Sequence, residues 1–234
     1  LILVLMKHPS RSGMFEDAYR LFEYGFELVS RDSSLQTVGF YDIRYRESAD
    51  LIHEFYKKGY ISGIEEGRFD YAAAVTREDF LRVLARIRGS AVAADGSNAV
   101  QSCLNAAIDQ GILDESWRGS GGKTMTRGDA ITIMSRHVIS TLDITEMLSL
   151  ISRIRNIKSI PASSRLDVLR AYDAGIIILN DDGTVAVNEL ISKEEMVLLL
   201  DRYIRHRDAV LRSIPDFMMQ ISFVKKAVQA FVGP

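Results

Sequence analysis

Three cationic residues occupy the same place in a short motif that the chain repeats. The motif reads apolar residue, hydroxyl residue, cation, any residue and acid. Its copies are Val75–Asp79, Met125–Asp129 and Ile191–Glu195, and their cations are Arg77, Arg127 and Lys193. A guanidinium or ammonium group can bind an anion through charge-assisted hydrogen bonds. The motif therefore predicts anion binding, repeated three times along one chain.

Each copy of the motif also predicts the start of a helix. Apolar residues at helical spacing follow it, as Phe80 and Val83 do in the first copy. The hydroxyl suits the N-cap, and the acid three residues later suits the other half of a capping box. The predicted capping pairs are Thr76 with Asp79, Thr126 with Asp129, and Ser192 with Glu195.

Capping accounts for the hydroxyl and the acid of the motif, but not for its cation. A cation in the first turn of a helix is disfavoured by the helix dipole, by roughly 0.3–1 kcal/mol. The same unfavourable choice in all three copies suggests a use. We therefore expect the cations to face outward and to bind an anion with help from the helix N-terminus.

Composition and charge narrow the class of protein. At 234 residues with 47% apolar composition, the chain is long enough for a sizeable core and for more than one unit. Its net charge of -2 is spread evenly, so we expect neither a nucleic-acid nor a bilayer partner. Apolar runs fall short of the roughly 18 residues of a membrane span. We expect a monomer that needs no cofactor, with the single Cys103 in its core.

The motif lies within a longer layout that repeats. In the first copy, a helix predicted from about residue 47 to 58 ends at Gly59, and Thr76 follows 17 positions later. In the third copy, Gly175 and Ser192 are also separated by 17 positions. Because both order and spacing recur, the chain reads as a repeat protein.

The second copy is the most diverged. Gly111 lies only 15 positions before Thr126, with a polar loop at residues 117–123 between them. An additional helix, predicted from about Ile144 to Ile157, fills the wider gap before the third copy. Helical patterns continue after the third copy, with a break at Pro215.

The layout of helix, glycine turn and hydroxyl-cation-x-acid helix resembles the S-layer homology family, in tandem over about residues 38–208. The resemblance implies a mainly α-helical fold in which three helix-loop-helix modules surround a helix bundle with pseudo-threefold symmetry. We expect modules at residues 38–90, 91–142 and 143–208, the last with the additional helix, and C-terminal helices at 209–234. In that family, grooves between modules hold pyruvylated secondary cell-wall polysaccharide. The implied function is non-covalent anchoring to the cell wall, outside a bacterial cell.

The resemblance also implies which residues bind the polysaccharide. The family's arginine maps onto Arg77 and Arg127 and, with a substitution, onto Lys193. A guanidinium holds a carboxylate through two parallel hydrogen bonds, which an ammonium group cannot reproduce, so we expect the third site to be weaker. Asp42 and Trp117 complete the predicted binding residues. Trp117 suits two roles equally well, stacking on a sugar or covering the second loop.

Because of two departures from the family pattern, we expect that at least one groove does not bind the polysaccharide. Ser48-Ala49 stands where a Trp-Ala pair is usual, so an aromatic group that stacks on sugars is missing. The third copy lacks an acid equivalent to Asp42.

Some further patterns resemble catalytic or metal sites but lack a feature that such sites need. Ser120 and Lys123 match the Ser-x-x-Lys of penicillin-binding nucleophiles, but the two glycines between them oppose the helix which that motif needs. The four histidines do not fall at paired metal spacing. We therefore expect neither a catalytic nor a metal site in this chain.

The first 31 residues have a pattern of their own. Leu1–Lys7 predicts a buried strand and Met14–Val29 an amphipathic helix, which cannot form a domain by themselves. The chain begins within this strand, without an initiator Met or a signal sequence. We therefore expect residues 1–31 to be the end of an α/β domain whose other elements, and a signal peptide, lie upstream.

Part of this segment resembles the end of the catalytic domain of serine D-alanyl-D-alanine carboxypeptidases. The resemblance lies in the residues Phe15-Glu16-Asp17-Ala18, then Leu21, then Tyr24-Gly25-Phe26. That family trims peptidoglycan, so the resemblance implies an anchored parent enzyme whose catalytic motifs lie upstream. Two alternatives stay open for the anchor. It belongs to an S-layer lattice protein that self-assembles, or it is a helical protein-interaction module without a sugar ligand.

Overall fold

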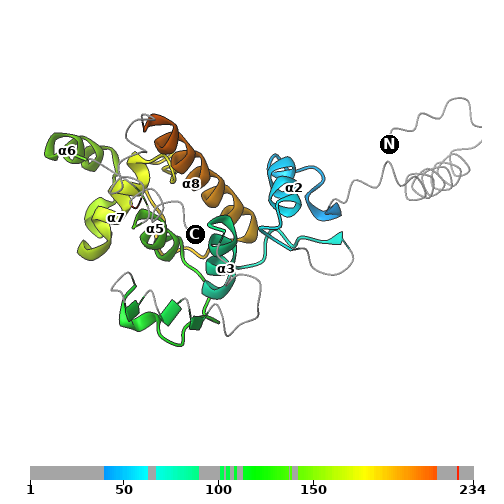
Figure 1. Cartoon of the computed structure of the whole chain (residues 1–234). Helices are drawn as coiled ribbons and strands as arrows, with labels where there is room; N and C mark the ends of the chain where they lie inside the picture. Colours follow the sequence, from blue (N-terminus) through cyan, green and yellow to red (C-terminus); the bar gives the residue numbers. More distant parts are fainter. Residues whose placement is uncertain are drawn as a thin grey trace, which may run out of the picture.

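The computed structural model describes residues 40–62, 67–89, 113–136 and 142–214, together with 101, 102, 104, 105, 108, 109, 138 and 226. This part of the chain is mainly α-helical, as predicted, and its β-structure consists of isolated bridges. The helices are α2 (Ala49–Lys57), α3 (Arg77–Ile87), α5 (Arg127–Ser135), α6 (Ile144–Arg153), α7 (Ala162–Asp173) and α8 (Lys193–Ser213) (Figure 1). Short 3-10 turns are η1 (Tyr41–Ile43), η4 (Glu115–Trp117) and η5 (Ile157–Ser159). The strand and helix predicted in residues 1–31, and Cys103, lie outside the described residues.

The three motif segments meet in a closed cycle of backbone hydrogen bonds. The N–H of Val75 donates to the carbonyl of Ile191 at 3.1 Å, and the N–H of Ile191 donates to the carbonyl of Met125 at 3.1 Å. The N–H of Met125 closes the cycle by donating to the carbonyl of Val75 at 2.7 Å. All three side chains are at most 1% exposed. Antiparallel bridges flank the cycle at Ala74–Ser192, Thr76–Thr124 and Thr126–Leu190. The motif segments are therefore related by an approximate threefold axis.

The same cycle holds the starts of the motif helices. The first N–H groups of a helix have no partner within that helix. In α3, the N–H groups of Arg77 and Glu78 donate to the carbonyls of Lys123 and Gly121, each at 2.9 Å. The equivalent bonds in α5 and α8 are Arg127 to Glu189, Gly128 to Val187, Lys193 to Ala73 and Glu194 to Tyr71, at 2.8–3.0 Å. Each helix start is thus capped by the loop of the next copy in the cycle. These N–H groups are not free for an anion, contrary to our expectation from the sequence.

The helices pack in the same cyclic order. The motif helix of the second copy, α5, packs on α7, which is the first helix of the third copy (Figure 1). The motif helix of the third copy, α8, packs on α2, the first helix of the first copy. Buried residues of these helices, among them Ile52, Ile131, Val168 and Val197, join one hydrophobic core. The third copy therefore packs back onto the first.

The first helices of the first and third copies end in the same way. Gly59 follows α2 with φ of +71°, and Gly175 follows α7 with φ of +66°. The N–H of Tyr60 then donates to the carbonyl of Phe55 at 3.0 Å, and Ile176 makes the equivalent bond at 2.9 Å. This is the Schellman arrangement, which needs a left-handed residue and so favours glycine. The helix ends that were predicted from these two glycines are confirmed.

Two helices differ from the prediction in their extent. The additional helix, α6, starts at the capping box of Asp143 and ends at Arg153, short of the predicted Ile157. It ends there because Ile154 turns into the core, where it is 1% exposed, and the residues after it form η5. The last motif helix, α8, runs unbroken to Ser213, so the helical pattern near residues 204–214 continues the third motif.

Gly128 generates a prediction about the contact between the second and third copies. A Cβ atom added to Gly128 would lie 2.9 Å from the backbone oxygen of Val187 and 3.3 Å from its Cβ. We expect Gly128→Ala to lower the free energy of unfolding by about 1–3 kcal/mol through overpacking, although alanine favours helix by about 1 kcal/mol. Gly122→Ala is the matched control, because a Cβ there meets no atom within 4 Å. Urea denaturation measures both variants, and equal stability would contradict this close approach.

Candidate functional site

In the first two copies, the motif cation lies against the motif acid of the next copy. Arg77 Nε and Nη2 donate to Asp129 Oδ2 at 3.3 and 3.1 Å. Arg127 Nε donates to Glu195 Oε1 at 2.6 Å. The side chains of Arg77 and Arg127 are only 15% and 20% exposed. Both cations therefore lie in the contacts between copies, whereas the sequence led us to expect outward-facing groups.

The motif acids have two roles. Each is preceded by a hydroxyl that accepts a hydrogen bond from the acid's own backbone N–H, as capping requires. In α5 the capping box is complete, because Asp129 also accepts from the N–H of Thr126. The carboxylates of Asp129 and Glu195 additionally bind the cation of the preceding copy. The sequence predicts the capping role but misses the ion pair, because a repeat pattern does not say which copies become neighbours.

The loop of the second copy encloses Arg77. Its guanidinium lies over the ring of Trp117, 3.8 Å from the centroid, and Nη1 donates to Ser120 Oγ at 2.7 Å. Ser120 is buried and donates in turn to the carbonyl of Trp117 at 2.7 Å. Trp117 is also buried, so in this structure it covers the second loop. The guanidinium of Arg77 occupies one face of its ring. Ser120 and Lys123 lie in a loop rather than on a helix, as the two glycines between them predict.

Arg127 is held by two carboxylates. Burial lowers the pKa of Arg127, but Glu195 and Glu189 raise it by more, so this pKa lies above its ordinary value. The second of these, Glu189, approaches Nη1 at 3.2 Å. The guanidinium therefore stays charged.

The contact between the third copy and the first is open, which here means that its motif cation and its motif acid do not form an ion pair. The ammonium group of Lys193 donates to the carbonyl of Phe69 at 3.1 Å. Within the described part of the chain, no carboxylate lies at ion-pair distance from it. Asp79, which is equivalent to Asp129, accepts instead from the hydroxyl of Thr76 at 2.6 Å. The cation and the acid that would close this contact are both directed to neutral partners.

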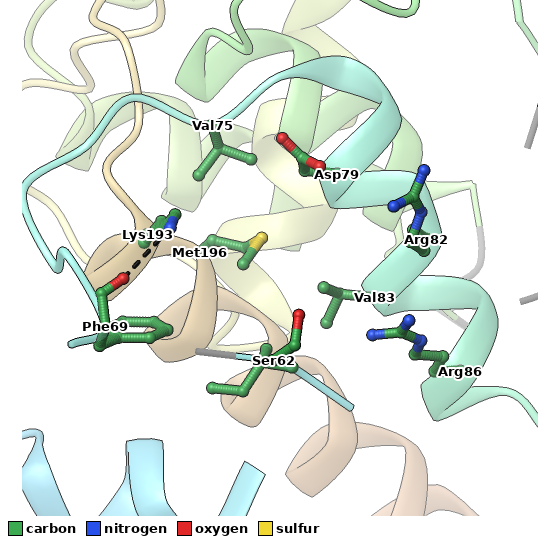
Figure 2. A pocket seen from close by; sticks show the side chains of 10 residues that line it. Ser62, Phe69, Val75, Asp79, Arg82, Val83, Arg86, Lys193 and Met196 are labelled. Carbon is green, nitrogen blue, oxygen red and sulfur yellow. Dashed lines mark hydrogen bonds between the residues drawn. The ribbon is translucent and has the colours of Figure 1, made fainter. Parts of the chain in front are cut away.

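A cavity of about 160 Å³ lies at this open position, between α3 and α8 (Figure 2). Its lining contains the charged residues Asp79, Arg82, Arg86 and Lys193. The other lining side chains include buried apolar residues of both helices. Arg82 and Arg86 were not among the residues predicted from the sequence. Helical spacing places them one turn apart, three and seven residues after Asp79, which is the signal that was available.

Asp42 holds the loop that carries Phe69. Its Oδ1 accepts from the N–H of Phe69 at 2.9 Å, and its Oδ2 accepts from the N–H of Asp70 at 2.6 Å. Burial raises the pKa of Asp42, but these backbone donors lower it by more, so it lies below its ordinary value. In the third copy, Asn156 holds the equivalent loop by exchanging two hydrogen bonds with the backbone of Val185, each at 2.9 Å. An amide thus replaces the acid that the third copy lacks.

Ser48, which stands where the family pattern has tryptophan, ties the first copy to the third. Its hydroxyl donates to Glu194 Oε1 at 2.5 Å, and Arg46 Nε donates to the same oxygen at 2.8 Å. The Arg46 guanidinium also lies 4.2 Å from the centroid of the Tyr71 ring. Arg46 and Ser48 hold the pKa of Glu194 below its ordinary value. This position therefore serves the contact between copies.

Residues 157–197 match the S-layer homology domain family. The third copy contains an S-layer homology domain. The domain begins at η5, includes α7 and the following loop, and ends in the first turns of α8. Its presence supports attachment to the cell wall by binding secondary cell-wall polymer in general, and it indicates a protein of the cell surface or cell wall.

A search of curated proteins gave no match to this chain. Among the helices that the structure describes, none is both long and apolar enough to cross a membrane. The described residues also contain no cluster of three or more His, Cys, Asp or Glu side chains suited to a metal ion.

Asp42 generates a prediction about pH. Because its pKa is lowered in the folded state, its stabilising effect is complete above the unfolded-state pKa of about 3.9 and is lost as pH falls through the folded-state pKa. We expect Asp42→Asn, which keeps one acceptor oxygen, to be less stable than wild type by about 1 kcal/mol at pH 7. The difference should shrink below about pH 4. Urea unfolding at a series of pH values measures it, and a constant difference would contradict the assigned role.

The ion pair of Arg127 and Glu195 generates a prediction about coupling between copies. We expect a double-mutant cycle of Arg127→Met and Glu195→Gln to give a coupling energy of about 1–2 kcal/mol, because the pair is largely buried. The exposed pair of Lys58 and Glu54 is the matched control, with about 0–0.5 kcal/mol. Unfolding free energies measure both cycles. A coupling as small as that of the control would show that this ion pair does not join the second and third copies.

Proposed function

We propose that this chain anchors a protein to the bacterial cell wall without covalent attachment, by binding a secondary cell-wall polysaccharide as a monomer. The observation that carries the proposal is the S-layer homology domain at residues 157–197. We further propose that residues 38–90 and 91–142 are two more modules of this kind, with the third module at 143–208 and C-terminal helices at 209–234. The cyclic contacts support this, because each motif segment makes the same backbone bonds to its neighbours.

The ligand that we propose is a polysaccharide that carries pyruvate ketals, whose carboxylates supply anions for the motif cations. The proposed binding residues are Arg77, Arg127 and Lys193, with Asp42 and Trp117 as supports. At Arg77 and Arg127, a ligand carboxylate must compete with the protein carboxylates that already bind these side chains. At Lys193 it competes with a neutral backbone carbonyl.

We also propose that the anchored parent is an extracellular serine D-alanyl-D-alanine carboxypeptidase. The support is the resemblance of residues 1–31, which lie outside the described part of the chain. Anchoring would hold such an enzyme beside peptidoglycan, which is its substrate. The coding sequence upstream should contain Ser-x-x-Lys and Lys-Thr-Gly motifs, and their absence would end this part of the proposal.

Cell-wall sacculi provide the test of anchoring. We expect the intact chain to bind purified sacculi and to lose most of this binding when the pyruvylated polymer is removed while peptidoglycan is kept. Binding should also weaken as salt is raised, because exposed charge contacts are screened with a Debye length of about 10 Å at 0.1 M salt. Co-sedimentation of the chain with sacculi measures both effects. Equal binding to the two preparations would rule out the polymer as ligand and would leave peptidoglycan or a protein partner.

A further inference from the structure

The outer side of α6 carries an inference that goes beyond the proposed function and does not depend on it. None of the residues of this helix is fully buried. On its inner side, Leu150 packs against the hydrophobic core and Met147 is half-buried. On its outer side, Ile144, Leu148 and Ile151 are 73%, 62% and 38% exposed. Their spacing of four and three residues places them in one row along the helix, which we call the outer stripe of α6.

The outer stripe is apolar surface that the ring of copies does not use. The helix lies at one edge of the described part of the molecule, where it packs on α7 (Figure 1). Within the residues that the structure describes, α6 packs through its inner side, and the outer stripe stays exposed. Single apolar side chains on a surface need no explanation, but three in a row along one helix are typical of an interaction site.

The charges of α6 indicate which partner fits the stripe. Asp143 and Glu146 form the capping box at its start, and Arg153 is the cation of its last turn. One end of the helix is therefore acidic and the other basic. A second α6 that lies antiparallel brings an acidic end beside a basic end twice, whereas a parallel one brings like charges together. A lipid surface fits less well, because α6 lacks the basic polar face of interfacial helices.

We propose that the outer stripe of α6 is a self-association surface, through which two copies of the chain pair antiparallel about a twofold axis. Leu148, in the middle of the stripe, contacts its counterpart across the axis. Ile144 of each chain packs on Ile151 of the other, and Asp143 lies opposite Arg153 at both ends of the contact. Such a pair is closed, because both chains use the same surface, so it forms dimers rather than filaments.

The size of the stripe sets the strength of the pairing. One helix face makes a small contact, of the kind found in weak complexes whose interfaces bury less than about 1,200 Å² in total. We therefore expect monomers in dilute solution and pairs at high concentration. Anchoring supplies that concentration, because chains held on one wall meet at a raised effective concentration. A single chain thus binds the polymer, as proposed above, and pairing adds a contact between anchored chains.

Sedimentation velocity of the intact chain over a concentration series tests the pairing. We expect a shift toward dimer as the concentration rises into the millimolar range. Leu148→Lys should raise the dissociation constant at least about 10-fold, because it removes apolar contact and sets two like charges against each other. Ile178→Lys is the matched control and should pair as wild type does, because Ile178 is 67% exposed but lies outside α6. Wild type that stays monomeric throughout, or equal weakening by both variants, would overturn the proposal.

Cysteine cross-linking tests the antiparallel arrangement. Leu148→Cys chains should form disulfide-linked dimers on mild oxidation, because the two new thiols face each other across the axis. Ile144→Cys chains should cross-link more readily to Ile151→Cys chains than to themselves. Wild type, with Cys103 as its single cysteine, gives the background. Cross-linking of Ile144→Cys chains to each other as fast as Leu148→Cys chains would contradict the twofold pairing.

Vesicles and sacculi separate pairing from other uses of the stripe. A chain that stays monomeric but binds phosphatidylcholine vesicles, and loses this binding with Leu148→Lys, would assign the stripe to a lipid surface and overturn the pairing. On sacculi, wild type should bind cooperatively as its density rises, whereas Leu148→Lys should bind with the same initial affinity but without cooperativity. Equal cooperativity in both would count against the proposal. If wild type does not bind sacculi, anchoring fails, and sedimentation still decides the pairing.

Discussion

The structure depends on three backbone hydrogen bonds that close a cycle between Val75, Met125 and Ile191. These residues are buried, so an unpaired amide at any of them would cost about 1–3 kcal/mol. No motif segment can satisfy its own groups, and each needs both of the others. The loop carbonyls that cap each helix lie two and four residues before the apolar residue of the motif in every copy. This fixes the residues next to the motif, while a loop further away, such as that of the second copy, is free to shorten.

The cycle also decides where the motif charges go. Because the helix starts are brought together around one axis, the cation of one copy lies near the acid of the next. Arginine fits this contact, since it can donate from several nitrogens, and two of the three positions are closed in this way. Lysine supplies a single charged group, and in the third position it binds a backbone carbonyl. The cavity between α3 and α8 lies beside this lysine.

The parts of the fold that were predictable from the sequence are those set by neighbouring residues. The hydroxyl caps, the glycines that end α2 and α7, and the start of α6 depend on residues within about five positions of one another. The pairing of Arg77 with Asp129 spans 52 positions, and the contact of Ser48 with Glu194 spans 146. Such partners are set by the ring closure, which no local pattern contains. The role of Asn156 was hidden for a related reason, since it reproduces the geometry of Asp42 without its charge.

A binding site in such a ring belongs to a pair of copies rather than to one domain. The S-layer homology domain at residues 157–197 contributes Lys193 and Met196 to the cavity, whereas Asp79, Arg82 and Arg86 come from the first copy. Whether a motif cation is available to a ligand therefore depends on which groups of the neighbouring copy it contacts. An arginine in this motif can be bound by a protein carboxylate, as Arg77 and Arg127 are. The lysine at the third position leaves a cavity beside it, because Asp79, the acid equivalent to Asp129, accepts from Thr76 instead of pairing with it.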